Sequence, residues 1–293
     1  MSIFEGSAVA LVTPFTQDGV NFEELEKLLD FHLKNSTDAI VACGTTGEPS
    51  TMTKEEKRSV IKFCVDYVAG RIPVIAGTGD NNTASSIENS KYAESIGADA
   101  LLMVTPYYNK CSQSGLVKHF FAVGDAVNIP IIVYNVPART GLNVLPATFL
   151  ALSQHKNIRA IKEASGNISQ IVETARLIEG KMDIYSGNDD QIVPLMSVGG
   201  KGVISVLANV VPKETHDLCA AYLAGDVKKA CAMQLQLNPL VSALFSDVNP
   251  IPVKTALNMM GFQAGPLRLP LSDMSKDAEA KLLSTLKEYG LAK

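Results

Sequence analysis

Short apolar segments recur along the chain at intervals of about 20 to 30 residues, and they are rich in valine and isoleucine. Most of them are apolar nearly throughout, which is typical of parallel strands that are buried on both faces. Amphipathic stretches with helical spacing lie between them. Eight strands that alternate with helices predict an α/β protein with a (β/α)8 barrel, the TIM barrel, rather than an open sheet. The eight segments are residues 8–12, 38–43, 72–77, 98–104, 130–136, 158–164, 183–187 and 202–206.

The sequence also marks where helices begin and where the strands stop. Thr53, with Glu56 three residues later, forms a capping-box pattern at the start of a helical stretch that ends near Ala69. Beyond about residue 225 the strand pattern stops, and three further helical stretches follow. We therefore expect a catalytic barrel over residues 1–224 and a C-terminal helical domain, a three-helix extension, over residues 225–293.

The composition predicts a large hydrophobic core and a modest negative net charge. Of the 293 residues, 46% are hydrophobic and 19% are charged, below the roughly 25% that is usual for globular chains. A net charge of −4 and a pI near 5.6 give no bulk attraction to nucleic acid or to an anionic membrane surface. The N-terminus lacks the pattern of a signal peptide, and no apolar run reaches the ~18 residues of a membrane span.

The cysteines and histidines show no spacing that is typical of a metal site. Five cysteines, an odd number, predict reduced thiols in a reducing compartment. The four histidines are scattered along the chain. We therefore expect a cytoplasmic protein without a bound metal. The cysteines are Cys43, Cys64, Cys111, Cys219 and Cys231.

A glycine-bracketed loop follows the second predicted strand. Active sites on such barrels lie at the carboxyl ends of the strands, so the residues after each strand are informative. The sequence GTTGEPS at residues 44–50 places the hydroxyls of Thr45 and Thr46 beside exposed backbone N–H groups, which suits a small anion. The loop lacks the lysine of a nucleotide-binding P-loop, so it does not indicate ATP.

Two further strand ends carry polar side chains. The fourth predicted strand leads into TPYYN, which contains Tyr107 and Tyr108. The fifth leads into YNVPARTG, with Tyr134 at the tip of the strand and Arg139 on the following loop. Taken singly, a tyrosine at a strand end is more often a packing residue, and an arginine is more often a surface charge. Because these residues are expected at the same edge of the barrel, they favour a functional site there.

Lys162 lies within the sixth predicted strand, IRAIKEA, where an ammonium group is not expected. One alternative is a lysine with a buried stem and a solvated head. The other is a desolvated lysine that loses its proton easily and attacks a carbonyl to form a Schiff base. The polar groups expected at the same end of the barrel favour the second interpretation.

Four motifs together give a resemblance to a known family. GTTGE, TPYYN, YNVPARTG and IKEASG match the dihydrodipicolinate synthase family, and the resemblance extends over essentially the whole chain. It implies a class I aldolase-type lyase on a TIM barrel with a C-terminal helical domain. It further implies condensation of pyruvate with L-aspartate 4-semialdehyde, a step of diaminopimelate and lysine biosynthesis.

The resemblance also implies catalytic roles for four residues of this chain. Lys162 would form the Schiff base with pyruvate. Thr45, Tyr134 and Tyr108 would relay protons, with Tyr108 reaching into the site of a neighbouring subunit. No cofactor is implied beyond the covalent pyruvate imine on Lys162.

Binding roles and self-association follow from the same resemblance. Thr46, with Thr45, would hold the pyruvate carboxylate, and Arg139 would bind the carboxylate of the second substrate. Gly187 and Ile204 would line the pocket through backbone atoms. The family implies a homotetramer built from two tight dimers, or a tight homodimer. Ser85 stands where lysine-sensitive members carry a glutamate, so we expect weak or absent inhibition by L-lysine.

Two alternatives remain open at this point. A sister activity on the same scaffold, such as N-acetylneuraminate lyase or a 2-keto-3-deoxy sugar acid aldolase, shares the lysine and the strand-five tyrosine. A barrel that only binds a ligand belongs to a different class of function. Arg139 and the TPYYN tyrosines favour the synthase over the sister activities, and the nucleophilic lysine argues against a protein that only binds.

Overall fold

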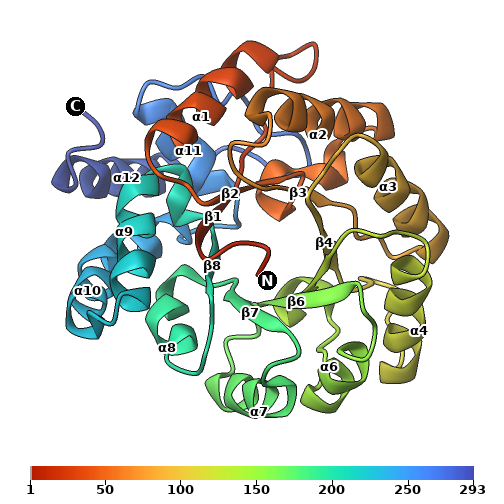
Figure 1. Ribbon diagram of the computed structural model, residues 1–293. Coiled ribbons are helices and arrows are strands. Elements are labelled where there is room, and N and C mark those ends of the chain that lie inside the picture. Colours follow the sequence, from red (N-terminus) through yellow and green to blue (C-terminus); the bar gives the residue numbers. More distant parts are fainter. Residues whose placement is uncertain (1) are drawn as a thin grey trace.

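Residues 2–293 of the computed structural model fold into a closed barrel of eight parallel strands surrounded by helices (Figure 1). Consecutive strands pair in order, and β8 pairs with β1 to close the ring. Each strand lies at one of the eight apolar segments, so the predicted TIM barrel is confirmed. The strands are β1 (Gly6–Ala10), β2 (Ala39–Ala42), β3 (Val74–Gly77), β4 (Ala100–Val104), β5 (Ile131–Asn135), β6 (Ile158–Glu163), β7 (Asp183–Ser186) and β8 (Gly202–Ser205).

The helices that follow the strands begin where the sequence indicates. The Asn21 side chain accepts the Glu24 N–H at the start of α1, and both bonds of the Thr53–Glu56 capping box are present at the start of α2. The ring consists of α1 (Phe22–Lys34), α2 (Lys54–Val68), α3 (Thr83–Ser95), α4 (Gln113–Gly124), α5 (Pro137–Thr140), α6 (Pro146–Leu152), α7 (Ile168–Ile178), α8 (Ile192–Met196) and α9 (Pro212–Leu223). Short 3₁₀ turns are η1 (Thr45–Gly47), η2 (Pro49–Thr51), η3 (Asp189–Gln191) and η4 (Leu207–Asn209).

The core has two layers because successive strand residues point to opposite faces. One layer of apolar side chains lies between the barrel and the helices, and a smaller one fills the barrel interior. At the N-terminal face the interior is closed by Phe4, whose ring stacks on Tyr185 at 4.2 Å between centroids. The Tyr185 hydroxyl donates to the Phe4 carbonyl at 2.7 Å. The start of the chain therefore seals this end of the barrel, as the central position of the N-terminus in Figure 1 shows.

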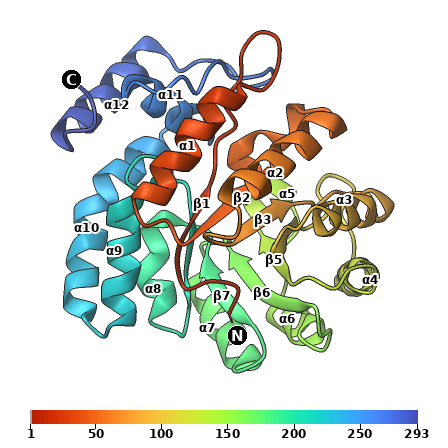
Figure 2. The same ribbon diagram turned by 45° about the horizontal axis from the view of Figure 1, so that its top comes forward.

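Three helices follow the barrel and pack on its outside, as predicted. They are α10 (Val227–Leu244), α11 (Ile251–Met259) and α12 (Lys276–Glu288). Figure 2 shows α10 beside α9, with α11 and α12 near α1. The expected division between residues 224 and 225 falls between α9 and α10, and its standing as a domain boundary stays a prediction. No helix within residues 2–293 is both long and apolar enough to cross a membrane.

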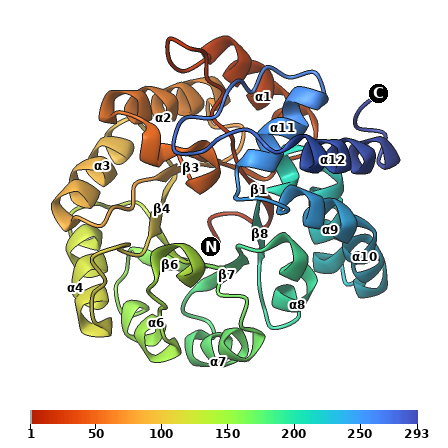
Figure 3. The same ribbon diagram turned by 180° about the vertical axis from the view of Figure 1, so that it is seen from behind.

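The C-terminal segment is fastened to the catalytic face of the barrel by charged groups. Lys254 of α11 donates to Glu48 at 2.7 Å, and both side chains are only 1% exposed. Arg268 pairs with Glu56 of α2 at 2.6 Å. Figure 3, seen from behind, shows α11 and the segment after it lying over the part of the ring that contains α1 and α2. Helix α11 and the segment after it therefore contact the loop that follows β2.

Barrel closure predicts a stability effect at Gly202. A Cβ atom there would lie 1.8 Å from the Gly6 carbonyl oxygen, and the φ of +144° is disfavoured for other residues. Gly202→Ala should lower the free energy of unfolding by about 3 kcal/mol or more, through strain and overpacking. The control is Gly180→Ala, where φ is +70° and nothing lies within 4 Å. Urea unfolding followed by circular dichroism compares the two, and equal midpoints would contradict the closure argument.

Candidate active site

Lys162 points into the barrel near the carboxyl end of β6. Side chains alternate along the strand, so Ala160 points into the barrel like Lys162, and Ile161 points outward into the layer that faces the helices. The Lys162 side chain is almost fully buried, since the residue is only 5% exposed, and its Nζ lies 4.3 Å from the centre of the Tyr134 ring. The head group is therefore not held in water, and the interpretation of a lysine with a buried stem and a solvated head is wrong here.

Burial changes the acidity of this amine. Desolvation is the largest influence and lowers the pKa of Lys162 to about 7. The negative charge of Asp189 acts in the opposite direction, and the positive charge of Arg139 reinforces the fall. Because burial outweighs the attraction of Asp189, a substantial fraction of Lys162 is a neutral, nucleophilic amine at neutral pH.

Tyr134 lies next to Lys162 because β5 and β6 pair in register at these two residues. Its side chain is buried, and burial raises the pKa of the phenol. The charge of Arg139 and a side-chain hydrogen bond with Thr45 oppose that rise. The phenol thus keeps its proton at neutral pH. The Tyr134 side chain contacts both Lys162, through its ring, and Thr45, through its hydroxyl, so it is placed to take part in proton transfer.

The loop after β2 is held tightly. A Cβ atom on Gly47 would lie 3.1 Å from both the Leu11 carbonyl oxygen and Thr13 Oγ1, and Thr13 donates to the Gly47 carbonyl at 2.8 Å. The loop turns into η1, whose first N–H groups have no partner within the turn itself. Thr46 is 1% exposed. The backbone and hydroxyl donors are thus fixed in place for a small anion.

The remaining predicted binding residues surround this loop and Lys162. Arg139 lies in α5, and its guanidinium donates to the Asn249 carbonyl at 3.0 Å. Gly187 follows β7, and a Cβ atom there would lie 3.1 Å from Lys162 Cε. Ile204 of β8 is fully buried in the barrel interior. A Cβ atom at Gly187 would also lie 2.7 Å from Ala164 Cβ, so the close packing against Ala164 and Lys162 explains why a glycine occupies that position.

A cavity of about 310 Å³ opens on the catalytic face. Thr45, Tyr134 and Arg139 line it, and it extends past Tyr107 to Asp80. Lys162 is not part of the lining, but its Nζ lies 4.3 Å from the centre of the Tyr134 ring. The cavity thus brings three of the predicted site residues together, and one of them contacts the amine.

Tyr108 does not join this cavity within one chain. Its side chain is 92% exposed, and its φ of 70° places a bulky residue in the left-handed region. The Tyr108 side chain therefore makes little contact with its own subunit, and it is not among the residues that line the cavity.

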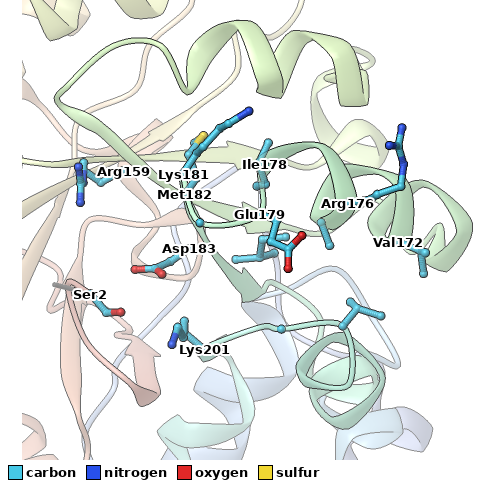
Figure 4. Close-up of a pocket in the computed structure, with 15 residues that line it drawn as sticks. Ser2, Arg159, Val172, Arg176, Ile178, Glu179, Lys181, Met182, Asp183 and Lys201 are labelled. Atoms are coloured by element: carbon cyan, nitrogen blue, oxygen red, sulfur yellow. The ribbon is translucent and has the colours of Figure 1, made fainter.

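A larger cavity, of about 660 Å³, lies at the opposite end of the barrel (Figure 4). Arg159, Asp183 and Lys201 line it from the starts of β6, β7 and β8, which is the face that serves stability rather than catalysis in such barrels. Two of its cations are already paired, Lys201 with Glu5 and Arg176 with Glu173. None of the predicted site residues lines it, so we assign the site to the smaller cavity.

Two polar residues near the site were missed by sequence reasoning. Asp189 is buried, and its Oδ2 accepts the N–H groups of Val206 and Leu207 at 3.0 and 2.9 Å. Asn249, from the loop before α11, donates to Thr46 Oγ1 at 3.1 Å. The run GNDD after β7 was a usable signal for Asp189, because it follows a strand end. No comparable signal pointed to Asn249, which lies outside the barrel sequence.

Within residues 2–293 no group of three or more metal-binding side chains is found. A buried amine beside a phenol and hydroxyls at the carboxyl ends of the strands defines a class of protein, the lysine-containing (β/α)8-barrel lyases. The model of the dihydrodipicolinate synthetase family matches residues 3–289. The chain belongs to this family, and it is a lyase.

Similar proteins cover the chain from end to end. A 4-hydroxy-tetrahydrodipicolinate synthase of Thermoanaerobacter sp. (strain X514) is 60% identical over 294 residues, covering 100% of this chain and 99% of the relative. The crystal structure of the dihydrodipicolinate synthase from Aquifex aeolicus is 46% identical, with a TM-score of 0.97 over 98% of this chain and 99% of that one. A structure described as a monomeric dihydrodipicolinate synthase variant is 43% identical, with a TM-score of 0.96 over 99% and 98%. The expected family is therefore confirmed.

The acidity of Lys162 predicts how stability varies with pH. A charge without a close partner in the folded state opposes folding, so Lys162→Met should raise the free energy of unfolding at pH 6 by about 1–4 kcal/mol. Between the folded pKa of about 7 and the unfolded value of 10.5 the unfolded chain binds more protons. The wild type therefore gains stability with rising pH, and the advantage of the variant shrinks. Chemical denaturation at pH 6, 8 and 10 measures this; an advantage that is constant over this range would contradict it.

Proposed function

We propose that this chain condenses pyruvate with L-aspartate 4-semialdehyde through a Schiff base on Lys162, which is the 4-hydroxy-tetrahydrodipicolinate synthase reaction of diaminopimelate and lysine biosynthesis. The observation that carries the proposal is the buried amine of Lys162 against Tyr134, with a pKa of about 7. An amine that is neutral near physiological pH can attack a ketone without prior loss of a proton. Family membership supports the choice of substrates.

The first half of the reaction uses the deep part of the site. The pyruvate carboxylate binds to the donors of Thr45 and Thr46, which brings the keto carbon to Lys162 Nζ. Attack forms a carbinolamine, and loss of water gives the iminium ion. Tyr134 supplies and accepts the protons of these steps, with Thr45 as the next hydroxyl of the relay. The iminium withdraws electrons, so the methyl group loses a proton and an enamine forms.

The second half joins the two substrates. Arg139 at the mouth binds the carboxylate of the semialdehyde, since a guanidinium can hold a carboxylate with two hydrogen bonds. The enamine carbon attacks the aldehyde carbon, and a new carbon–carbon bond forms while the aldehyde oxygen takes up a proton. The amino group of the semialdehyde then attacks the iminium carbon. Ring closure expels the Lys162 amine and restores the enzyme, so one water is released overall.

We propose that the functional unit is a tight homodimer, alone or within a homotetramer. The 92% exposure of Tyr108 and its left-handed backbone support this, because such a residue is poorly stabilised by its own chain. In a tight dimer its hydroxyl would complete the relay of the neighbouring subunit. Since one similar structure is a monomeric variant, assembly is not fixed by the family. A cytoplasmic location likewise stays a proposal.

Weak or absent inhibition by L-lysine also stays a prediction. Of the two carboxylates near Ser85 that could hold an ammonium group, Glu88 is already paired with Lys54 and Arg58. Asp80 lines the cavity together with Lys57. A cation that lines the same cavity weakens the attraction of this carboxylate for an ammonium group, which supports the expectation.

The activity can be tested with a trapping experiment and a rate assay. Incubation with pyruvate and borohydride should add mass at Lys162, and Lys162→Arg should gain none because its guanidinium stays protonated. A coupled assay should show turnover of pyruvate with aspartate semialdehyde. N-acetylneuraminate, run beside it, should give no cleavage. An adduct on another lysine, or cleavage of N-acetylneuraminate at the higher rate, would contradict the proposal.

Shared sites predict complementation between two inactive variants. Tyr108→Phe lacks the relay hydroxyl and Lys162→Ala lacks the nucleophile, so each homodimer should be nearly inactive. A hybrid dimer contains one site with both groups intact and should recover about half of the wild-type activity per dimer. The measurement mixes the variants and verifies subunit exchange by mass spectrometry of differently tagged chains. Full exchange without recovery would show that Tyr108 does not act across the interface.

A further inference from the structure

Asn249 joins three parts of the catalytic face that lie far apart in sequence. It lies between α10 and α11 and is 6% exposed. Its side-chain Nδ2 donates to Thr46 Oγ1 at 3.1 Å, over a separation of 203 residues. Its backbone carbonyl accepts Arg139 at 3.0 Å, over a separation of 110 residues. One residue of the C-terminal segment therefore contacts a side chain assigned to each substrate carboxylate.

The direction of the bond to Thr46 decides what that hydroxyl can do. A threonine hydroxyl carries one proton and accepts through its lone pairs. Because Thr46 Oγ1 accepts from the Asn249 amide, its own proton is left to donate elsewhere. No other hydrogen bond of this hydroxyl forms within residues 2–293. A bound carboxylate, which only accepts, needs a donor of this kind.

The Asn249 side chain contacts the chain through its donor end alone. Its Oδ1 is buried and has no hydrogen-bond donor among residues 2–293. A buried amide oxygen without a partner costs about 1–3 kcal/mol. An apolar side chain of similar size would fill the same space without that loss, so space-filling does not explain the amide. The hydrogen bond that the amide donates to Thr46 does explain it.

The segment that carries Asn249 is fixed to the same loop at a second point. Five residues further on, Lys254 forms its buried ion pair with Glu48, at the end of the Thr45–Thr46 loop. The Arg268 N–H also donates to Glu48 at 3.2 Å. Asn249 and its target are therefore held together by contacts on both sides, and the amide has little freedom to turn away.

We propose that Asn249 is a positioning residue for the substrate carboxylates: its side-chain amide turns the Thr46 hydroxyl proton toward the pyruvate carboxylate, and its backbone carbonyl aims Arg139. The inference rests on the proposed function, because it assumes that pyruvate binds next to Thr46. It assigns to the C-terminal helical segment a part in substrate binding that the barrel alone does not supply.

Replacement by two different side chains separates donation from packing. Asn249→Ala removes the donor and leaves the backbone carbonyl for Arg139, so it should raise the pyruvate concentration for half-maximal adduct formation on Lys162 by about tenfold, the loss of one hydrogen bond. Asn249→Asp keeps the shape but accepts the Thr46 proton and adds a negative charge beside the substrate anion. It should be worse than alanine, by a further factor of about ten. The KM for aspartate semialdehyde should change less than threefold in Asn249→Ala, since Arg139 keeps its partner.

A matched control replaces another buried asparagine by aspartate, far from the site. Asn157 is a buried amide that donates to the Gly124 and Val127 carbonyls at 3.0 and 2.7 Å, at the N-terminal side of β6. Asn157→Asp should lower stability without altering half-saturation by pyruvate. A packing role for Asn249 gives the reverse order, with the isosteric aspartate close to wild type and alanine impaired; that order, or no effect in either variant, overturns the inference.

A double-mutant cycle covers the case in which Asn249→Asp does not fold. If Asn249 acts through the Thr46 hydroxyl, adding Asn249→Ala to Thr46→Val should weaken pyruvate binding no further. Fully additive effects would reject the inference. The borohydride adduct on wild-type Lys162 is the reference throughout. Its absence would refute the proposed function itself, whereas a normal adduct with unchanged binding in the Asn249 variants refutes only the role of Asn249.

Discussion

An amine kept out of water inside a closed barrel is the constraint around which the catalytic face is arranged. Within the barrel, the Lys162 amine contacts the Tyr134 ring and feels the charges of Asp189 and Arg139. Desolvation then opposes the charged form more strongly than Asp189 can support it. The groups that would approach a substrate beside Lys162 are uncharged hydroxyls, and the cation Arg139 lies on α5 with an exposed side chain.

Much of the fold was accessible from the sequence because it depends on local patterns. The eight apolar segments, the capping signal at Thr53 and the helical stretches of the tail are each read from neighbouring residues in the sequence. The barrel follows from their repetition. The lysine in the sixth strand was also visible, because a charged residue contradicts the pattern of its own segment. These features need no knowledge of which segments meet in space.

The contacts that were missed join segments that no local pattern relates. Asn249 meets Thr46 across 203 residues, and Glu48 meets Lys254 across 206. Asparagine before proline is an ordinary turn signal, so nothing in NPIPVK indicated a buried amide at the site. The degree to which Lys162 loses its proton was beyond the sequence as well. It depends on how completely other strands exclude water from one atom.

Phe4 and Tyr185 close the barrel interior at the N-terminal face, so the site is reached from the catalytic face. With the far end closed, a molecule that reaches Lys162 enters from the catalytic face, where Arg139 lines the cavity. In the proposed reaction, the substrate that binds at Lys162 would lie deeper in the site, and the substrate that binds at Arg139 would cover it. In the reaction proposed above, the substrate that bonds to Lys162 would therefore bind before the one that binds to Arg139, because the opposite end of the barrel is closed.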